Sequence, residues 1–99
     1  MVPPTARGLR AGAVVLRPGE VMDWHSTHAR EELLIALAGC AQLEVQLAPR
    51  RTRRVTLKAG VCAFLPCEMV HRVVNRSPRV TRYLYVTASV ASRRKEVAK

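Results

Sequence analysis

All three histidines of this 99-residue chain lie in two short segments that also carry acidic side chains. His25 and His28 are followed closely by Glu32, and His71 lies much further along the chain. Neutral imidazole nitrogens together with one carboxylate form a typical site for a divalent transition metal, and coordination positions left open can admit water or substrate. The four residues are therefore candidate metal ligands, and the donor set is compatible with iron, manganese, nickel or zinc.

The spacing of the first two histidines leaves two arrangements open. Residues three apart on a regular strand point to opposite faces, so His25 and His28 cannot both point inward from such a strand. A β-bulge between them would restore their convergence and give a four-ligand site. Without a bulge, His25, Glu32 and His71 form a three-ligand site and His28 is a loop residue. A third possibility for His71 is a hydrogen-bonded core histidine without any metal.

The segments around these residues have the periodicity of strands. Residues 41–47 alternate between apolar and polar side chains, with Glu44 on the polar face, and predict a half-buried strand. After Pro49 and an arginine cluster, residues 55–58 complete a hairpin. Further extended runs are predicted at residues 12–17, 21–25, 32–38, 61–65, 71–75 and 80–87. Many short strands without a helical pattern between them indicate a barrel or a sandwich.

The extended run at residues 32–38 is largely apolar on both faces. Its two faces carry Glu32, Leu34 and Ala36 on one side and Leu33, Ile35 and Leu37 on the other. A strand that is apolar on both faces needs cover on both. The interior of the domain supplies one cover, and we expect a second copy of the protein to supply the other. A tail that folds back over the strand is the alternative to this homodimer.

The two segments together resemble the motifs of a small single-domain cupin. The first cupin motif is matched by Gly19, His25, His28, Glu32 and Gly39, and the second by Gly60, Pro66, His71 and Asn75. Two positions depart from the family pattern. Glu68 occupies a glycine position of the second motif, and the histidine pair is spaced His-x-x-His rather than His-x-His.

The resemblance implies an all-β fold of the cupin type, a double-stranded β-helix or jelly-roll barrel over residues 12–89. It leaves a short N-terminal arm at residues 1–11 and a basic C-terminal tail at residues 90–99. It also implies a divalent transition metal on His25, His28, Glu32 and His71, and a small organic ligand in the barrel. Arg30 beside the site makes an anionic ligand a candidate. Dioxygenase- and isomerase-like reactions are implied, and the sequence leaves open whether the protein is an enzyme or a non-catalytic binding or sensor module.

Bulky side chains near the candidate ligands are expected to shape the cavity. Met22, Phe64 and Met69 are interpreted as apolar filling. Tyr83 and Tyr85 alternate along a late strand and either line the pocket or pack in the core or an interface.

The charge of the chain is strongly positive, with 17 Lys and Arg against 7 Asp and Glu. Arginines are concentrated at residues 50–54, and such an excess attracts phosphates and other acidic partners. Aromatic residues make up only 4% of the chain, and no nucleic-acid-binding motif accompanies the charge. The sequence therefore disfavours nucleic-acid binding, and a basic adaptor for nucleic acid or another acidic partner is the last alternative.

Length and composition indicate one globular domain, since the chain has a mass of 11.0 kDa and is 48% hydrophobic. Its apolar stretches are too short to span a bilayer, and residues 1–7 lack the apolar centre of a signal peptide. Its three cysteines, an odd number, favour a reducing compartment. These features predict a cytoplasmic protein without a membrane partner.

Overall fold

The computed structural model describes residues 2, 3 and 5–90, and every regular element in them is a β-strand. The strands are β1 (Leu9–Leu16), β2 (Val21–Ser26), β3 (Arg30–Ala38), β4 (Cys40–Ala48), β5 (Arg51–Lys58), β6 (Cys62–Leu65), β7 (Val70–Val74) and β8 (Thr81–Ser89). Within these residues no helix has the length and apolar character that crossing a bilayer requires.

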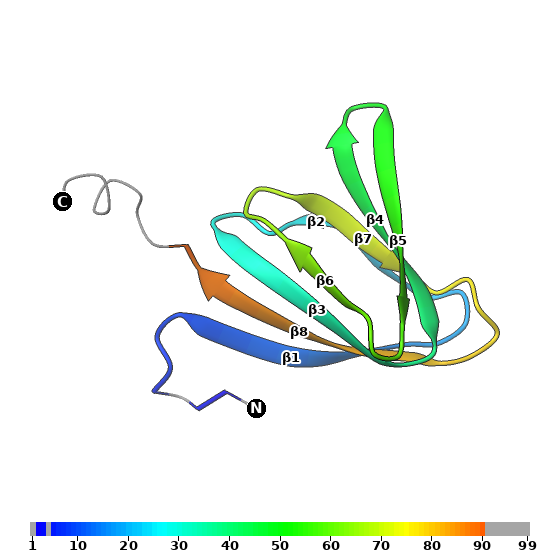
Figure 1. Ribbon diagram of the computed structural model, residues 1–99, viewed down its shortest axis with the longest axis horizontal. Coiled ribbons are helices and arrows are strands. Elements are labelled where there is room, and N and C mark those ends of the chain that lie inside the picture. The colour runs from blue at the N-terminus through cyan, green and yellow to red at the C-terminus, as the bar shows by residue number, and fades with distance from the viewer. Residues whose placement is uncertain (1, 4, 91–99) are drawn as a thin grey trace.

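The strands form two antiparallel sheets of four strands each, in the orders β1-β8-β3-β6 and β2-β7-β4-β5. Figure 1 shows the two sheets as the walls of an open barrel, with the β4–β5 hairpin standing clear of it. Strands that are distant in the sequence are neighbours in both sheets, which is the crossing pattern of a jelly roll. The predicted all-β, cupin-type barrel is confirmed.

The core lies between the sheets and follows the alternation of each strand. On β3, Leu34 and Ala36 are buried, whereas Leu33 and Leu37 are 37% and 51% exposed on the other face. The same inward alternation on the other strands completes a hydrophobic core of Leu16, Leu34, Ala36, Ala41, Leu43, Val45, Leu57, Leu65, Val73 and Tyr83. The two faces of β3 are therefore divided as its sequence predicted.

Several strands extend beyond their predicted limits, and β5 and β1 do so most because backbone pairing continues past the apolar residues. β5 begins at Arg51 rather than at residue 55, since Arg53 and Arg54 pair with Val45 and Glu44 of β4. β1 begins at Leu9, within the segment expected as an N-terminal arm, and pairs with β8 along its whole length. Of the expected tail at residues 90–99, residues 91–99 lie outside the described part of the chain.

Asn75, at the end of the second motif, joins two loops at one end of the barrel. Its buried side-chain amide donates hydrogen bonds to the carbonyl oxygens of Leu16, at 2.9 Å, and Arg79, at 2.7 Å. Its Oδ1 accepts hydrogen bonds from the backbone N–H and the hydroxyl of Ser77. Asn75 therefore has a structural role, because these bonds satisfy every polar atom of its side chain.

The turn between β3 and β4 depends on Gly39, which has a φ of 82°. A Cβ atom at this position would collide with the carbonyl oxygen of Val80 and lie 2.7 Å from Cα of Thr81. Gly60 has a similar φ of 90°, but no atom lies within 4 Å of a Cβ added there. Both positions favour glycine because its backbone adopts a positive φ without strain. Only Gly39 also lacks the space for a side chain.

We expect Gly39→Ala to lower the free energy of unfolding by roughly 2–4 kcal/mol, because backbone strain and a collision with a neighbouring strand add together. The matched control, Gly60→Ala, has only the strain and should cost about 1–2 kcal/mol. Urea unfolding of the two variants and the parent protein measures the difference. Equal losses would show that the close approach at Gly39 contributes nothing.

Candidate metal centre

Two histidines from neighbouring strands lie side by side on the inner wall of the second sheet. His25 of β2 is paired directly with His71 of β7, and their ring centroids are 4.2 Å apart with an interplanar angle of 57°. His71 is 1% exposed, whereas His25 lies at the open side of the interior. Antiparallel pairing thus brings together two imidazoles that are far apart in the sequence.

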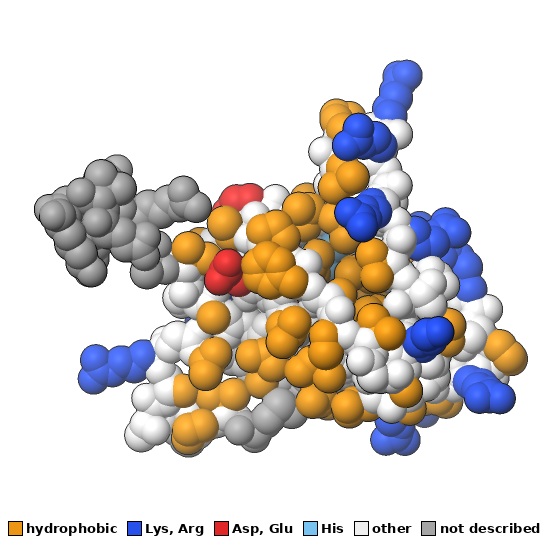
Figure 2. All heavy atoms as spheres, viewed as in Figure 1, with side chains coloured by type: hydrophobic (Ala, Val, Ile, Leu, Met, Phe, Trp, Pro, Cys, Tyr) orange, Lys and Arg blue, Asp and Glu red, His pale blue; other side chains and the backbone are white. Residues whose placement is uncertain are grey.

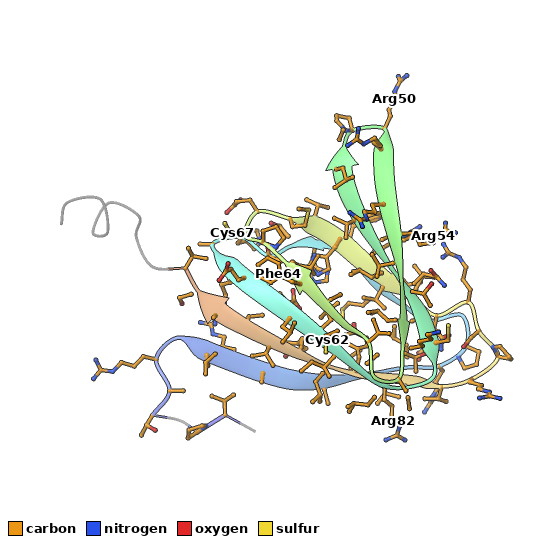
Figure 3. The ribbon with its side chains drawn as sticks, in the orientation of Figure 1. Arg50, Arg54, Cys62, Phe64, Cys67 and Arg82 are labelled. Atoms are coloured by element: carbon orange, nitrogen blue, oxygen red, sulfur yellow. The ribbon has the colours of Figure 1, made fainter. Side chains whose placement is uncertain are left out.

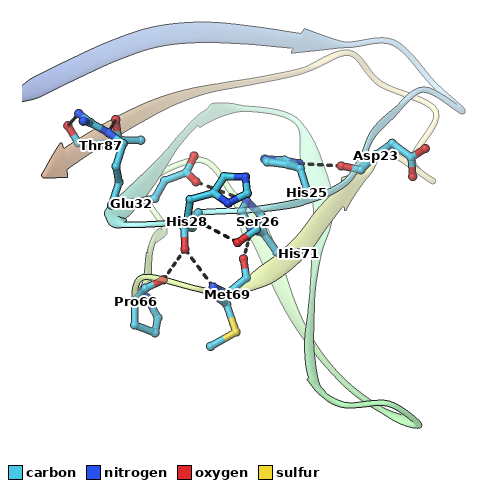
Figure 4. A network of polar contacts seen from close by, with 11 residues as sticks. Asp23, His25, Ser26, His28, Glu32, Pro66, Met69, His71 and Thr87 are labelled. Atoms are coloured by element: carbon cyan, nitrogen blue, oxygen red, sulfur yellow. Dashed lines mark hydrogen bonds and ion pairs between the residues drawn. The ribbon is translucent and has the colours of Figure 1, made fainter. Parts of the chain in front are cut away.

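The third member of the group comes from the opposite sheet. Glu32 of β3 is 9% exposed, and its Oε1 lies 3.4 Å from Nε2 of His71. One ligand atom from each of His25, Glu32 and His71 lies within 4.8 Å of the others. Figure 4 shows the three side chains converging from their different strands. The structure therefore brings together three of the four predicted ligands.

Both imidazoles are oriented by the backbone. Nδ1 of His25 lies 2.6 Å from the carbonyl oxygen of Asp23, and Nδ1 of His71 lies 3.0 Å from that of Met69. A carbonyl oxygen only accepts hydrogen bonds, so each Nδ1–H must be the donor. In the neutral ring this leaves the lone pair on Nε2, the arrangement found in metal-bound histidines whose other nitrogen is held by a backbone carbonyl.

The dimensions of the group fit a transition metal. Nitrogen and oxygen ligands bind such metals at about 2.0–2.2 Å, which places neighbouring ligand atoms about 3.0–3.4 Å apart. The 3.4 Å separation between Glu32 and His71 already meets this, and the full group, within 4.8 Å, needs only a small contraction. Two imidazoles and one carboxylate also leave coordination positions open for other ligands.

His28 lies in the turn after β2, outside this group. It is exposed, has a φ of 52°, and its backbone N–H donates a hydrogen bond to Oγ of Ser26 at 2.9 Å. Its carbonyl oxygen accepts a 2.7 Å hydrogen bond from the N–H of Glu68. The register shift of β2 falls between Met22 and His25 and not between the two histidines. His28 is therefore a loop residue at the edge of the cavity (Figure 4).

The group opens into a cavity of about 670 Å³, which is within the range of small-molecule sites. Besides His25, His28, Glu32 and His71, its wall includes Arg10, Met22, Arg30, Tyr83, Tyr85 and Thr87. Both alternatives for the tyrosines are observed, because Tyr83 and Tyr85 line the cavity while Tyr83 belongs to the hydrophobic core and Tyr85 packs against it.

The expectation that Phe64 fills the cavity is wrong. Phe64 is 60% exposed and lies on the outer face of β6, as Figure 3 shows. Its neighbours Ala63 and Leu65 point inward instead, since successive side chains of a strand alternate between faces. Met22 does line the cavity, and Met69 packs against the core.

The two tyrosines place phenol groups in the wall of the cavity that Glu32 also lines. Burial raises the pKa of Tyr83 above its ordinary value, and the charges of Glu32 and Tyr85 raise it further. Its hydroxyl is therefore protonated at neutral pH and can donate a hydrogen bond. The Tyr85 ring lies against β1 at Gly12, where a Cβ atom would collide with the phenol. A glycine within a strand is the signal that could have pointed to this close approach.

Arg30 at the cavity edge is half-buried and connects three segments. Its guanidinium donates hydrogen bonds to Oγ1 of Thr87 at 2.9 Å, Oγ of Ser89 at 3.0 Å and the carbonyl oxygen of Gly8 at 2.7 Å. All these acceptors are uncharged, so the positive charge of Arg30 is held in place without being neutralised by them. The sequence indicated a cation near the site but not this structural role.

The family model described as a cupin domain matches residues 12–87. The chain belongs to the cupin family. Its fold is similar to that of a Cupin 2 conserved barrel domain protein from Salinispora arenicola CNS-205, with a TM-score of 0.74 and 27% identity over 100% of this chain and 80% of the other.

Two further structural neighbours show the fold alone, because their identity to this chain is low. A predicted oxalate decarboxylase from Thermotoga maritima has a TM-score of 0.72 and 20% identity, over 81% of this cupin and 65% of that chain. An oxalate oxidase in complex with the substrate analogue glycolate has a TM-score of 0.77 and 15% identity, over 83% and 42%. This chain spans only 51% to 65% of the length of several of its structural neighbours. A search of the curated proteins found no match.

We expect Gly12→Ala to lower the free energy of unfolding by about 1–3 kcal/mol, because the new methyl group displaces the Tyr85 ring. Replacing the ring as well, in the double variant Gly12→Ala with Tyr85→Leu, should cost less than the two single changes added together. Urea unfolding of the four proteins measures this coupling. Additive losses would mean that Gly12 and Tyr85 do not constrain each other.

Proposed function

We propose that this cupin binds a divalent transition metal through His25, Glu32 and His71 and takes a small organic anion into its barrel. The observation that carries this proposal is the convergence of the three ligand atoms within 4.8 Å at the wall of a cavity. The hydrogen bonds from both Nδ1 atoms to backbone carbonyls support it, because they leave the two Nε2 atoms available.

The donor set favours iron among the candidate metals iron, manganese, nickel and zinc. Two histidines and one carboxylate with open positions are the ligand set of non-haem iron(II) oxygenases. A bound metal of this kind supplies Lewis-acid or oxygen-activating chemistry. We therefore propose an oxygenase-like transformation of the bound molecule, with an isomerase-like one as the alternative. The part of Glu32 and the imidazoles is to hold the metal at one wall of the cavity.

The charges around the cavity support an anionic ligand. Arg10 and Arg30 both line it, and Glu32 is the one acidic side chain among its described lining residues. The hydrogen bonds of Arg30 go to neutral groups, so its charge acts on the cavity. The phenol of Tyr83 adds a hydrogen-bond donor. Structural neighbours named as oxalate decarboxylase and oxalate oxidase are consistent with a small carboxylate.

Metal content provides the direct test. We expect protein loaded with iron(II) and then desalted to retain about one metal per chain, and His71→Ala to lose at least tenfold of the affinity because a buried ligand is removed. The matched control is His28→Ala, which removes an imidazole from the same cavity but from outside the ligand group, and should retain the metal. Elemental analysis after dialysis measures both. Equal loss from the two variants would indicate a four-ligand site, and no loss from either would contradict the metal proposal.

Turnover separates an enzyme from a binding or sensor module. Protein reconstituted with each of iron, manganese, nickel and zinc is incubated with small carboxylates, with and without oxygen, and the products are identified. We expect turnover with at least one metal, and its loss in His71→Ala. Tight metal and carboxylate binding without turnover for any combination would contradict the enzymatic part of the proposal and favour the sensor module.

We also propose that the protein is a homodimer formed through the outer face of the β1-β8-β3-β6 sheet. Strand pairing places mostly apolar side chains there, together with the charged Glu31 and Arg82: Leu9, Ala11, Ala13, Val15, Leu33, Ile35, Leu37, Cys62, Phe64, Leu84, Val86 and Ala88. Figure 2 shows hydrophobic side chains gathered over this face, with Lys and Arg at its margins. Phe64 is 60% exposed and Val15 50%. An apolar patch of this kind marks an interface, and an identical copy presents a matching apolar surface.

We expect Phe64→Glu to shift the protein from dimer to monomer, because a charge on this face would be buried without a partner in the interface. The matched control is Val21→Glu, since Val21 is 43% exposed on the second sheet. Sedimentation equilibrium at several concentrations gives the mass of each variant. A monomeric parent protein, or a dimer that survives Phe64→Glu, would contradict this interface.

A further inference from the structure

The β4–β5 hairpin continues beyond the sheet to which it belongs. β4 pairs with β7 only from Gln42 to Val45, but its pairing with β5 continues to Ala48 and Arg51. Residues 46–54 are all exposed, and Figure 1 shows this end of the hairpin standing clear of both sheets. We call residues 46–54 the β4–β5 ribbon. It is a two-stranded β-structure with solvent around it.

The ribbon is strongly basic. It carries Arg50, Arg51, Arg53 and Arg54 and no acidic residue. Figure 3 shows Arg50 at its tip and Arg54 near its base. None of these arginines lines the cavity of the metal centre. Four like charges on a short hairpin repel one another, so an acidic partner would stabilise this arrangement.

At the base of the ribbon, a buried carboxylate holds three guanidinium groups, that of Arg54 and those of two arginines outside the ribbon. Glu44 of β4 lies between Arg54 of β5 and Arg72 of β7 in the strand pairing. Its oxygens lie 3.2 Å from Arg54, 2.6 Å from Arg72 and 3.0 Å from Arg76. The Glu44 side chain is 3% exposed, whereas those of Arg54 and Arg76 are 61% and 47% exposed. One anion thus fixes three cations, and two positive charges remain in excess.

The ionised state of Glu44 keeps this cluster together. Burial by itself raises the pKa of Glu44, but hydrogen bonds from Arg72 and Arg76 and their positive charges outweigh it, so the pKa lies below its usual value. Arg72 also lies over the indole of Trp24, 4.7 Å from the ring centroid. The guanidinium groups are therefore placed before any partner arrives, which lowers the entropy lost on binding.

Protection of an edge strand explains part of this pattern. β5 is the edge strand of its sheet, and charged side chains on an edge prevent pairing with another chain. That role does not require Arg72 and Arg76, which lie on or next to the inner strand β7, nor a buried carboxylate that orders them. Phosphate is the partner that suits guanidinium groups best, because its oxygens accept paired hydrogen bonds from them.

We propose that the β4–β5 ribbon, together with Arg72 and Arg76, docks on the phosphodiester backbone of duplex DNA. The major groove of B-form DNA is about 12 Å wide and admits a two-stranded β-ribbon. Arginines along the ribbon then reach the phosphates at the groove edges, and the cluster around Glu44 contacts the adjoining backbone. Such contacts are independent of base sequence. This surface is separate from the metal centre and adds a second activity to the protein.

Salt dependence of binding to a short duplex DNA tests the proposal with the full-length chain. Contacts from six arginines predict a slope of about −5 for the logarithm of affinity against the logarithm of salt concentration. The triple variant Arg50→Gln, Arg51→Gln and Arg53→Gln should make the slope shallower by about 2 to 3 and weaken binding at least tenfold at low salt. Because these side chains are exposed, the melting temperature should not change.

A charge-matched variant provides the control. Arg7→Gln, Arg17→Gln and Arg79→Gln remove the same charge from exposed positions outside the ribbon and outside the strands of the proposed dimer face. This variant should keep the slope of the parent protein. Equal weakening by both triple variants would mean that net charge alone attracts the DNA and would overturn the proposal. If the ribbon triple variant does not fold, the double variant Arg50→Gln with Arg53→Gln replaces it, with a shift of about 2.

Binding to other polyanions tests whether duplex DNA is the preferred partner of the ribbon. Duplex RNA of the same sequence should bind more weakly, because its major groove is deep and narrow. Polyglutamate and vesicles of anionic phospholipid should also bind more weakly than duplex DNA. Equal or stronger binding to the RNA would overturn the groove placement, and equal or stronger binding to polyglutamate or the vesicles would overturn the choice of nucleic acid. A slope near zero for the parent protein would overturn the whole proposal.

Discussion

Glu32 and His71 face each other across the interior of the barrel, 3.4 Å apart and almost completely withdrawn from water. Polar groups buried in this way cost several kcal/mol unless they find partners, and a carboxylate costs the most. The fold supplies these partners through strand register. Glu32 shares the inward face of β3 with Leu34, so a slip of one residue would move the carboxylate to the outer apolar face. The packing of the core and the position of the ligands are therefore set by the same alternation.

The arginines of this cupin have different roles in different parts of the fold, and the net charge of +10 does not reveal those roles. Arg30 ties β3 to the end of β8 and the start of β1 through neutral acceptors. Arg72 is held by a buried carboxylate and an indole ring. Arg50 and its neighbours project from a hairpin without acidic residues. Two basic regions result, one at the cavity and one on the ribbon, and the ligand proposed for each is different.

Most strands and the convergence of His25, Glu32 and His71 were predictable because they rest on short-range alternation and on motif spacing. Glu44 shows the limit of this reasoning. Its place on the polar face of β4 predicted exposure, but cations from two neighbouring strands and a loop cover it. Phe64 shows the opposite error, since an aromatic residue near the motif was assigned to the interior. The sequence does not state which strands are neighbours, and the burial of Glu44 depends on those neighbours. The side on which Phe64 lies follows instead from the alternation along β6, where Ala63 and Leu65 face the core. The position of His28 depends on a turn with positive φ, which spacing alone does not reveal.

The hydrogen bonds of Arg30 have a consequence for how a ligand is captured. Its guanidinium already uses four of its five N–H donors on Thr87, Ser89 and Gly8, so an arriving anion is attracted mainly by the charge. Long-range attraction of this kind raises the rate of encounter and is weakened by ionic strength, whereas residence time depends on close contacts. In this barrel the association rate of an anionic ligand would thus depend on Arg30 at the rim. Its residence time would depend on the group of His25, Glu32 and His71 at the wall.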